Sequence, residues 1–488
     1  MAELAYTPLG EITTIVQDLR TTFNSGLTKP LAYRKEQLKG LHNLMDENDK
    51  LIREASFLDL HKHPQELVVG ETGIGKQECV EAIKNLDAWA APHYVKTGML
   101  NKMDAPHIRK EPLGMVLIIG AWNYPLNLLL APAVGAIAAG NTVVLKPSEV
   151  APHTAALLTR LLPLYLDSRS YRIVNGAAEE TTALLEHKFD HIFYTGSGSI
   201  GKIIMGAAAK QLTPVTLELG GKSPAFVTKD VDVSTAARRL TWGKFFNCGQ
   251  TCIAPDYVII ERGIEQEFVK HMQEHLKEFY GASAQTSESY GRVVNRNHFH
   301  RLKKVLDNTK GNVVIGGETQ EDDLFIAPTV VLDVQPGDSL LEAEIFGPLL
   351  PIMVVDSVQQ GLDYVNAGDQ PLALYVFSNN RKTSDFILDH TRSGGAVVND
   401  VLVQFGVSTL PFGGTGPSGI GNYHGQRSFD TFSHERGTII KSLGMERVNN
   451  IRYPPYSEKK IGWIQWILYD KLKYSPNAAN PGADKAKL

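Results

Sequence analysis

The sequence predicts an α/β protein built on a parallel, doubly wound sheet. From Arg109 onward, short β-rich runs alternate with Ala- and Leu-rich helical stretches, and a Gly, Ser or Pro follows each run. This alternation is typical of parallel strands that are joined by helices. The four expected strands are Met115–Ile119, Thr142–Leu145, Arg172–Val174 and His191–Tyr194.

The segments on either side of this region extend the prediction. Residues 10 to 92 carry Leu, Ala, Glu and Lys at helical spacing and predict two or three helices. A second α/β region begins near Gly221, and residues 410 to 421 are rich enough in Gly and Pro to predict a loop without regular structure. The expected elements of the second region are Ala225–Val227, Tyr257–Ile260 and a helix at Ile264–Tyr280.

Composition excludes several classes of protein. The 488 residues suggest two or three lobes, and 43% hydrophobic with 21% charged residues is an ordinary globular mixture. A net charge of -4 without long one-sign blocks argues against a nucleic-acid binder and favours a small-molecule partner. No stretch reaches the roughly 18 apolar residues of a membrane span. Three cysteines and no recognisable secretory signal predict a reducing, cytoplasmic location.

Two thiols lie four residues apart in a Gly-containing turn, at Cys248 and Cys252. A thiol in such a turn can act as a nucleophile, although burial as a small hydrophobic side chain is the commoner fate of a cysteine. No second Cys/His pair with ligand spacing accompanies them, so we expect no metal site.

One carboxylate, Glu218, is embedded in an apolar run that ends in two glycines. Burial would raise its pKa and make it a suitable proton acceptor. The alternative is a structural salt bridge with a neighbour such as Lys222.

Two small-residue turns follow expected strands and suit a dinucleotide. The turn around Gly196 and Ser197 leads into a helix, whose free backbone N–H groups favour a phosphate. Lys146 and Glu149 close another strand and offer a cation and a carboxylate for a ribose. A lone glycine pattern is weak evidence for dinucleotide binding, because ordinary turns share it.

Two further segments add polar and aromatic groups. Asn123, after a buried strand, presents an amide donor of the kind that an oxyanion site needs. Glu344 and Phe346 offer a carboxylate and an aromatic face, which suit a ribose and a flat ring, although a turn with a core Phe has the same pattern.

Taken together and in order, these segments strongly resemble the aldehyde dehydrogenase superfamily, and most closely its class 3 branch, which includes fatty aldehyde dehydrogenases. The resemblance covers roughly residues 10 to 455 and rests on WNYP, KPSE, FYTGS, LELGGK, GQTCIAPDY, EIFGP and PFGGTGPSG. It implies the aldehyde dehydrogenase fold, with a Rossmann-like NAD(P)-binding domain, an α/β catalytic domain and a small β bridging or oligomerisation element. The implied boundaries are 1–95 plus 114–219, 220–421, and 96–113 plus 422–445, with a C-terminal extension at 446–488.

The resemblance also assigns roles to single residues. Cys252 corresponds to the nucleophile, Glu218 to the general base and Asn123 to the oxyanion donor. The implied cofactor residues are Trp122, Lys146, Glu149, Gly196, Ser197, Leu219, Glu344 and Phe346. NAD is the expected cofactor, since Glu149 would bind a ribose hydroxyl and repel a 2′-phosphate. NADP is expected to be accepted as well.

The expected reaction is oxidation of a medium- or long-chain aliphatic or an aromatic aldehyde to its acid through a Cys252 thioester, by a homodimer. Two alternatives are a CoA-acylating semialdehyde dehydrogenase, against which Glu218 argues, and a non-catalytic binding protein on the same fold. Residues 461–474 predict a short amphipathic helix that covers the aldehyde tunnel, packs within or across subunits, or lies on a membrane surface.

Overall fold

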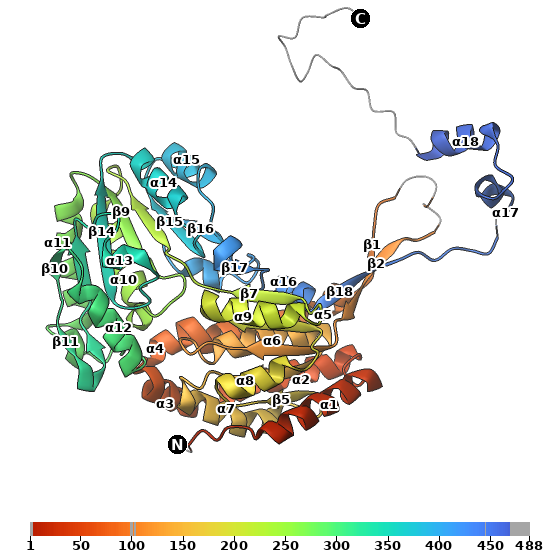
Figure 1. The fold of residues 1–488 in the computed structure, drawn as a ribbon, viewed down its shortest axis with the longest axis horizontal. Coiled ribbons are helices and arrows are strands. Elements are labelled where there is room, and N and C mark those ends of the chain that lie inside the picture. Colours follow the sequence, from red (N-terminus) through yellow and green to blue (C-terminus); the bar gives the residue numbers. More distant parts are fainter. Residues whose placement is uncertain (1–2, 98–100, 102–103, 445, 469–488) are drawn as a thin grey trace, which may run out of the picture. The chain divides into compact units, whose positions relative to one another are not determined.

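The computed structural model describes residues 3–97, 101, 104–444 and 446–468. The chain forms two compact units, one of Met1–Ala90 with Lys110–His434 and one of Ala91–Arg109 with Glu435–Leu488. Figure 1 labels the elements along the chain. The larger unit contains two multi-stranded sheets, and each is built around a parallel core of buried strands.

The first sheet has six strands in the order β17-β7-β6-β3-β4-β5. Neighbours from β7 to β5 pair in parallel, whereas β17 pairs with β7 in the antiparallel sense. β3, β4 and β6 are buried along their whole length, as expected of strands that helices cover on both faces. The bounds are β3 Met115–Ile119, β4 Thr142–Lys146, β5 Tyr171–Ile173, β6 His191–Thr195, β7 Val215–Glu218 and β17 Gly419–Ile420.

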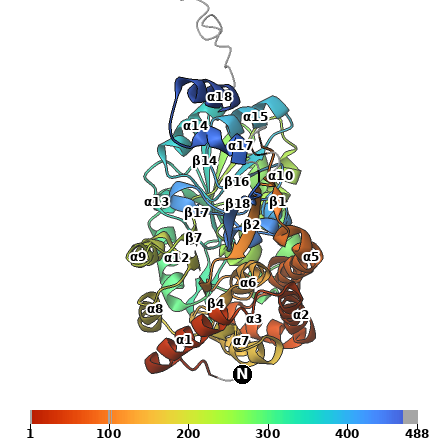
Figure 2. The same cartoon turned by 90° about the vertical axis from the view of Figure 1, so that its right-hand side faces the viewer.

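Helices pack on both faces of this sheet, and Figure 2 shows the two groups on opposite sides of β4. The α1 helix contacts β3, β4 and α8, and α9 contacts β6 and β7. The other group contains α2, α5, α6 and α7, of which α6 is buried at every position. A helix that is apolar all round belongs inside a core. The bounds are α1 Leu9–Ser25, α2 Leu31–Glu47, α5 Gly73–Ala90, α6 Asn127–Ala139, α7 Pro152–Tyr165, α8 Ala178–Leu185 and α9 Gly198–Ala209.

The prediction of two or three N-terminal helices is wrong, because five α-helices precede β1. Besides α1, α2 and α5 these are α3 Asp49–Leu60 and α4 Pro64–Leu67. Asn48 separates α2 from α3, and a π-helical turn at Val68–Thr72 joins α4 directly to α5. Uninterrupted helical spacing along the sequence conceals such breaks.

The second sheet has seven strands in the order β10-β13-β14-β9-β8-β15-β16 and is parallel except for β10. Its strands are β8 Pro224–Val227, β9 Tyr257–Glu261, β10 Asn312–Ile315, β13 Thr329–Leu332, β14 Leu349–Val355, β15 Ala373–Phe377 and β16 Gly395–Val398. Its helices are α10 Val233–Phe245, α11 Glu265–Tyr280, α12 Arg296–Asp307, α13 Ser339–Glu342, α14 Val358–Ala367 and α15 Arg381–Asp389. A small pair, β11 Thr319–Gln320 and β12 Phe325–Ile326, stands apart.

The segment 410–421 is not wholly irregular, so the loop prediction is wrong at its end. Gly416–Ser418 forms a 3₁₀ turn, and Gly419–Ile420 is strand β17, paired with Glu218 and Leu217 of β7. The chain then forms α16 Gln426–Thr431.

A third sheet has the order β1-β2-β18, with bounds His93–Tyr94, His107–Pro112 and Ser433–Thr438. The smaller unit contains α17 Glu446–Asn449 and α18 Glu458–Leu468. The predicted helix at 461–474 is present up to Leu468, and its remainder lies outside the described residues. No helix in the described ranges is long and apolar enough to cross a membrane.

Candidate active site

The nucleophile candidate follows a sharply turned segment at the end of α10. Asn247, Cys248 and Gly249 have φ angles of 51°, 54° and 72°, so three successive residues adopt the left-handed conformation. A Cβ at Gly249 would lie 2.3 Å from the Gly347 carbonyl oxygen, so no side chain fits there. This backbone path delivers Cys252 to the wall of a cavity.

The two thiols lie in different surroundings. Cys248 is buried, its sulfur donates to the Tyr290 hydroxyl at 3.7 Å, and burial raises its pKa to about 12. Cys252 is only partly buried and lines a cavity of about 220 Å³. The rest of the wall is mainly apolar and comprises Val69, Gly70, Ile74, Tyr124, Leu128, Trp242, Phe246, Thr251, Ile253, Leu402, Val403, Phe405 and Gly406. Of the two thiols, only Cys252 can therefore react with a molecule bound in this cavity.

Glu218 occupies the last position of β7, with its side chain buried. Within the described part of the chain neither of its carboxylate oxygens accepts a hydrogen bond. Burial therefore raises its pKa well above the usual range. The alternative of a salt bridge to Lys222 is wrong, because the Lys222 ammonium pairs with Asp256 instead.

Two carboxylates, those of Glu344 and Glu218, interact electrostatically with the Cys252 thiol. Burial raises the pKa of Cys252, and the charges of Glu344 and Glu218 raise it further. A raised pKa disfavours the thiolate, so a base must accept the thiol proton before the sulfur can attack.

Asn123 is buried just after β3, where its backbone and side chain make separate contacts. Its Nδ2 donates to the Gln250 carbonyl oxygen at 3.0 Å, two residues before Cys252. An amide nitrogen carries two N–H groups, so one can fix the side chain while the other faces a ligand. Its carbonyl oxygen accepts from Lys62 Nζ and from Asn247 Nδ2, each at 2.9 Å.

Four expected cofactor residues lie at the ends of β4 and β6. Lys146 and Glu149 form an ion pair at 2.7 Å, so the expected ribose ligands contact each other. Ser197 is the N-cap of α9, and the Gly196 amide donates to the Glu218 carbonyl oxygen at 3.0 Å. The N-terminus of α9, with the amides of its first turn, is the kind of site that binds an anion.

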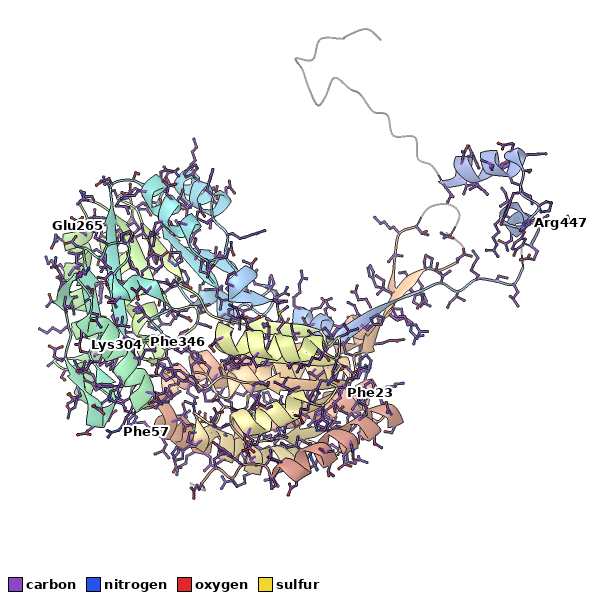
Figure 3. All side chains as sticks on the ribbon, in the orientation of Figure 1. Phe23, Phe57, Glu265, Lys304, Phe346 and Arg447 are labelled. Carbon is purple, nitrogen blue, oxygen red and sulfur yellow. The ribbon has the colours of Figure 1, made fainter. Side chains whose placement is uncertain are left out.

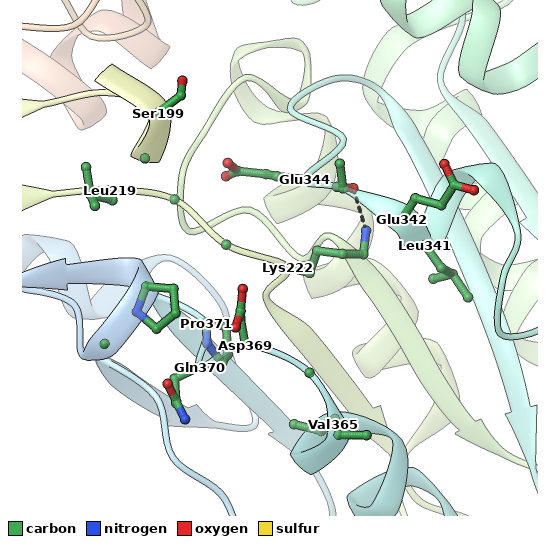
Figure 4. Close-up of a pocket in the computed structure, with 18 of the residues that line it drawn as sticks. Ser199, Leu219, Lys222, Leu341, Glu342, Glu344, Val365, Asp369, Gln370 and Pro371 are labelled. Carbon is green, nitrogen blue, oxygen red and sulfur yellow. Dashed lines mark hydrogen bonds between the residues drawn. The ribbon is translucent and has the colours of Figure 1, made fainter. Parts of the chain in front are cut away.

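Leu219 and Glu344 line a larger cavity of about 740 Å³, together with Ser199 at the start of α9 (Figure 4). In that view the Glu344 carboxylate points toward the side on which Ser199 lies. A Cβ at Gly220 would come within 2.1 Å of Glu344 Oε2, so the carboxylate occupies space that only glycine leaves. Burial raises the pKa of Glu344 to about 8, and the Gly221 backbone amide lowers it in part.

Trp122 and Phe346 pack against each other, with ring centroids 5.3 Å apart in a T-shaped arrangement. Phe346 has a φ of 48°, which is uncommon for an aromatic residue, and Arg301 donates to its carbonyl oxygen at 3.4 Å. Figure 3 labels Phe346 on the side of the second sheet's lobe that is nearest α9. Phe346 is only partly buried, so its ring is not part of the core.

Two charged residues behind this site were not assigned a role there from the sequence, which indicated Lys222 only as a possible partner of Glu218. Lys222 donates to the carbonyl oxygens of Leu340 and Ala343 at 3.0 and 2.9 Å, while Asp256 accepts from the Ile345 amide at 3.0 Å. This pair therefore fixes the residues before and after Glu344 in the chain, Ala343 and Ile345. Lys222 stands in the LELGGK motif, so its proximity to the motif could have revealed it.

A second group of missed charges lies beneath Asn123 and consists of Lys62, Glu66 and Glu71. The Lys62–Glu71 pair has completely buried side chains. Burial raises the pKa of Glu66 to about 7, while the Lys62 charge and the Asn247 amide lower it in part. No motif marks these residues. Among the described residues no group of three or more His, Cys, Asp or Glu side chains could hold a metal.

Comparisons with known proteins agree with this arrangement. The sequence model of the aldehyde dehydrogenase family matches residues 2–437. The chain is 48% identical to "Aldehyde dehydrogenase family 3 member A2" of Rattus norvegicus over 453 residues, which is 93% of both chains. It is also 48% identical to "Aldehyde dehydrogenase, dimeric NADP-preferring" of Mus musculus, over 92% of this chain and 99% of the relative.

Solved structures give the same result. The Staphylococcus aureus aldehyde dehydrogenase AldH in its substrate-bound state superposes with a TM-score of 0.91 and 38% identity, over 94% of this chain and 99% of the other. An indole-3-acetaldehyde dehydrogenase complexed with NAD+ superposes with a TM-score of 0.82 and 25% identity, over 90% and 91%. The chain has the fold of these enzymes and belongs to the aldehyde dehydrogenase family, whose members oxidise aldehydes.

Proposed function

We propose that this enzyme oxidises its aldehyde through a thioester on Cys252, with Glu218 as the general base that activates the hydrolytic water. The observation that supports this most directly is the partly exposed Cys252 in an apolar cavity, with the buried Glu218, which accepts no hydrogen bond from the residues that the structure describes, in electrostatic range. A buried carboxylate without a partner is costly, because its charge is desolvated without compensation, and such groups cluster at functional sites.

In the first half-reaction the Cys252 thiol gives its proton to water, and the resulting thiolate adds to the aldehyde carbonyl carbon. The resulting oxyanion accepts hydrogen bonds from the second N–H of Asn123 and from the Cys252 backbone amide. A bound NAD or NADP would supply the acceptor for the hydride that this carbon loses. The carbon–sulfur bond remains, and the acyl group is retained as a thioester.

In the second half-reaction Glu218 removes a proton from water, and the hydroxide adds to the thioester carbon. Collapse of this adduct breaks the carbon–sulfur bond and releases the acid, and the proton held by Glu218 passes to the departing thiolate and restores the thiol. Covalent capture therefore divides one difficult oxidation into two easier steps.

The residues around the 740 Å³ cavity fit a dinucleotide. Ser199 and Glu344 line this cavity and suit the pyrophosphate and the nicotinamide ribose, and Ser197, the N-cap of the same helix α9, also suits the pyrophosphate. Lys146 and Glu149 would hold the adenosine ribose, with Gly196, Leu219, Trp122 and Phe346 contributing to the remaining surface. In the Lys146–Glu149 ion pair the lysine charge offsets the carboxylate charge that would repel a 2′-phosphate. We therefore propose NAD as the cofactor, with NADP also accepted.

The apolar wall of the smaller cavity supports medium- or long-chain aliphatic or aromatic aldehydes as substrates. One relative carries the word "dimeric" in its name, which supports a homodimer.

We also propose that 1–95 with 114–219 binds the cofactor, 220–421 is catalytic, and 96–113 with 422–445 bridges subunits. Three free cysteines support a reducing, cytoplasmic location.

A direct test is NADH absorbance at 340 nm with a panel of aldehydes, in the presence and absence of coenzyme A. Oxidation without the coenzyme, and acid as the only product, supports hydrolysis by Glu218. A requirement for coenzyme A would instead indicate the acylating reaction, and lack of turnover with every aldehyde would contradict the mechanism.

Replacing Gly70 by alanine should narrow the aldehyde cavity. A Cβ there would lie 2.7 Å from a ring carbon of Tyr124, whose hydroxyl contacts Thr251 Oγ1 at 2.6 Å. We expect kcat/KM for bulky aldehydes to fall by about 10-fold and that for acetaldehyde much less. Gly10→Ala is the matched control, because a Cβ there meets nothing within 4 Å. Equal losses for all aldehydes would contradict a role in cavity size.

Deleting residues 461–488 should weaken turnover of long-chain aldehydes more than that of short ones. Helix α18 exposes Ile461, Trp463 and Trp466, and such an apolar surface suits a lid over an apolar substrate. The measurement is kcat/KM against chain length. Equal losses would indicate a role in stability or dimerisation, and loss of liposome co-sedimentation without kinetic change would indicate a membrane contact.

A further inference from the structure

A completely buried ion pair lies next to Asn123. Lys62 Nζ and Glu71 Oε1 are 2.6 Å apart, and neither side chain is exposed to solvent. Lys62 follows the end of α3, and Glu71 belongs to the π-helical turn Val68–Thr72. Single π turns occur preferentially at functional sites, since the extra residue redirects the side chains around it.

Each charge also binds the backbone between β3 and α6. Lys62 Nζ donates to the Asn123 carbonyl oxygen at 2.9 Å and lies 4.3 Å from the centre of the Tyr124 ring. The second oxygen of Glu71 accepts from the Leu126 amide at 2.9 Å. The pair therefore holds this segment at both of its ends.

The same carbonyl oxygen connects this segment to the nucleophile turn. Asn247 Nδ2 donates to the Asn123 oxygen at 2.9 Å and to the Gln250 oxygen at 3.1 Å. The Gln250 oxygen also accepts from Asn123 Nδ2 at 3.0 Å. A continuous set of hydrogen bonds thus runs from Lys62 through Asn123 to the residues that precede Cys252.

A buried ion pair is weak grounds for a role in stability, because the desolvation of both charges offsets their attraction. Besides their mutual contact, Lys62 and Glu71 each form a hydrogen bond with the short segment between β3 and α6. That segment carries the Asn123 amide that is proposed to bind the oxyanion. Positioning of the amide explains this arrangement better than stability, since an apolar pair could fill the same space.

We propose that Lys62 and Glu71 are positioning residues that hold the Asn123 amide in the geometry required for oxyanion binding. The inference rests on the proposed role of Asn123. A donor displaced by about 1 Å loses most of its effect on an oxyanion, so the pair acts on the acylation step without touching substrate.

The test uses Lys62→Met and the double variant Lys62→Met/Glu71→Gln. The single variant leaves a buried carboxylate without its partner and can unfold the protein. The double variant removes both charges and keeps an oxygen that can accept from the Leu126 amide. Thermal melting and the rate of Cys252 alkylation by iodoacetamide show whether the fold and the thiol are intact.

In the folded double variant we expect the rate of the pre-steady-state NADH burst to fall by about 10- to 100-fold, with KM and the alkylation rate unchanged. Asn123→Ala should slow the burst by about 100-fold or more, and adding the double variant to it should cause no further loss. Leu86→Ala, a fully buried position in the α5 core, controls for destabilisation and should lower Tm without slowing the burst.

The results separate the two proposals. An unchanged burst in Asn123→Ala would overturn the proposed role of that amide. A slow burst in Asn123→Ala with a normal burst in the double variant would overturn the positioning role alone. Fully additive losses when the variants are combined would also overturn it, because Lys62 and Glu71 would then act independently of the amide.

Discussion

Replacing Cys252 by alanine is expected to abolish aldehyde oxidation, with a loss of roughly 10⁴-fold or more in kcat. The variant removes the atom that forms the thioester and leaves no neighbouring nucleophile in the 220 Å³ cavity wall except hydroxyls. Cofactor binding should persist, since Cys252 does not line the 740 Å³ cavity. Quenching of protein fluorescence by NADH measures this binding, and NADH formation measures the loss of activity.

Cys248→Ala is the control that the chain itself supplies. This thiol is buried four residues earlier, and its sulfur contacts the Tyr290 hydroxyl instead of the aldehyde cavity. We expect a loss of about 1 kcal/mol in the free energy of unfolding and near-normal kcat. Inactivity of a folded Cys248→Ala together with activity of Cys252→Ala would reverse the assignment of the nucleophile.

The parallel sheets were predictable because their signals are local. β3, β4 and β6 are continuous apolar runs between Gly- and Pro-rich turns, and each lies within a residue of its expected range. β17 was not predictable, since two residues of a Gly-rich loop form a strand only through pairing with β7. Its pairing is a tertiary effect that no periodicity records.

The candidate site divides in a similar way. Cys252, Glu218 and Asn123 stand in motifs, so the resemblance identified them before any geometry was known. Lys62 and Glu71 stand in an ordinary Glu- and Lys-containing helical region, where charged residues usually face solvent. Their burial follows from the π turn and from packing under Asn123, and neither feature leaves a pattern in the sequence.

The pKa shifts also required the structure. The apolar run around Glu218 suggested that its side chain is buried. Its carboxylate oxygens accept no hydrogen bond within the described part of the chain, and this depends on residues from distant segments. The same holds for Glu344, whose carboxylate lies against Gly220 more than 100 residues earlier. Desolvation at both positions comes from the fold around them.

Glu218→Gln is expected to slow hydrolysis of the thioester by about 100-fold while leaving its formation largely intact. Glutamine fills the same buried space but cannot accept a proton from water. A rapid burst of NADH, close to one equivalent per active site, should therefore precede slow turnover. Stopped-flow absorbance at 340 nm separates the two phases, and hydroxylamine should release the trapped acyl group as a hydroxamate.

The pH dependence gives this prediction a second, independent readout. Burial raises the pKa of Glu218, and the group acts only as the carboxylate, so the hydrolytic rate should rise as pH increases through that raised pKa. In Glu218→Gln this rise should disappear from the steady-state rate. The burst should still depend on the pKa of Cys252, which burial and Glu344 keep raised although the charge of Glu218 no longer contributes. If Glu218→Gln abolishes the burst while cofactor still binds, the carboxylate acts before the thioester forms, as the base for Cys252.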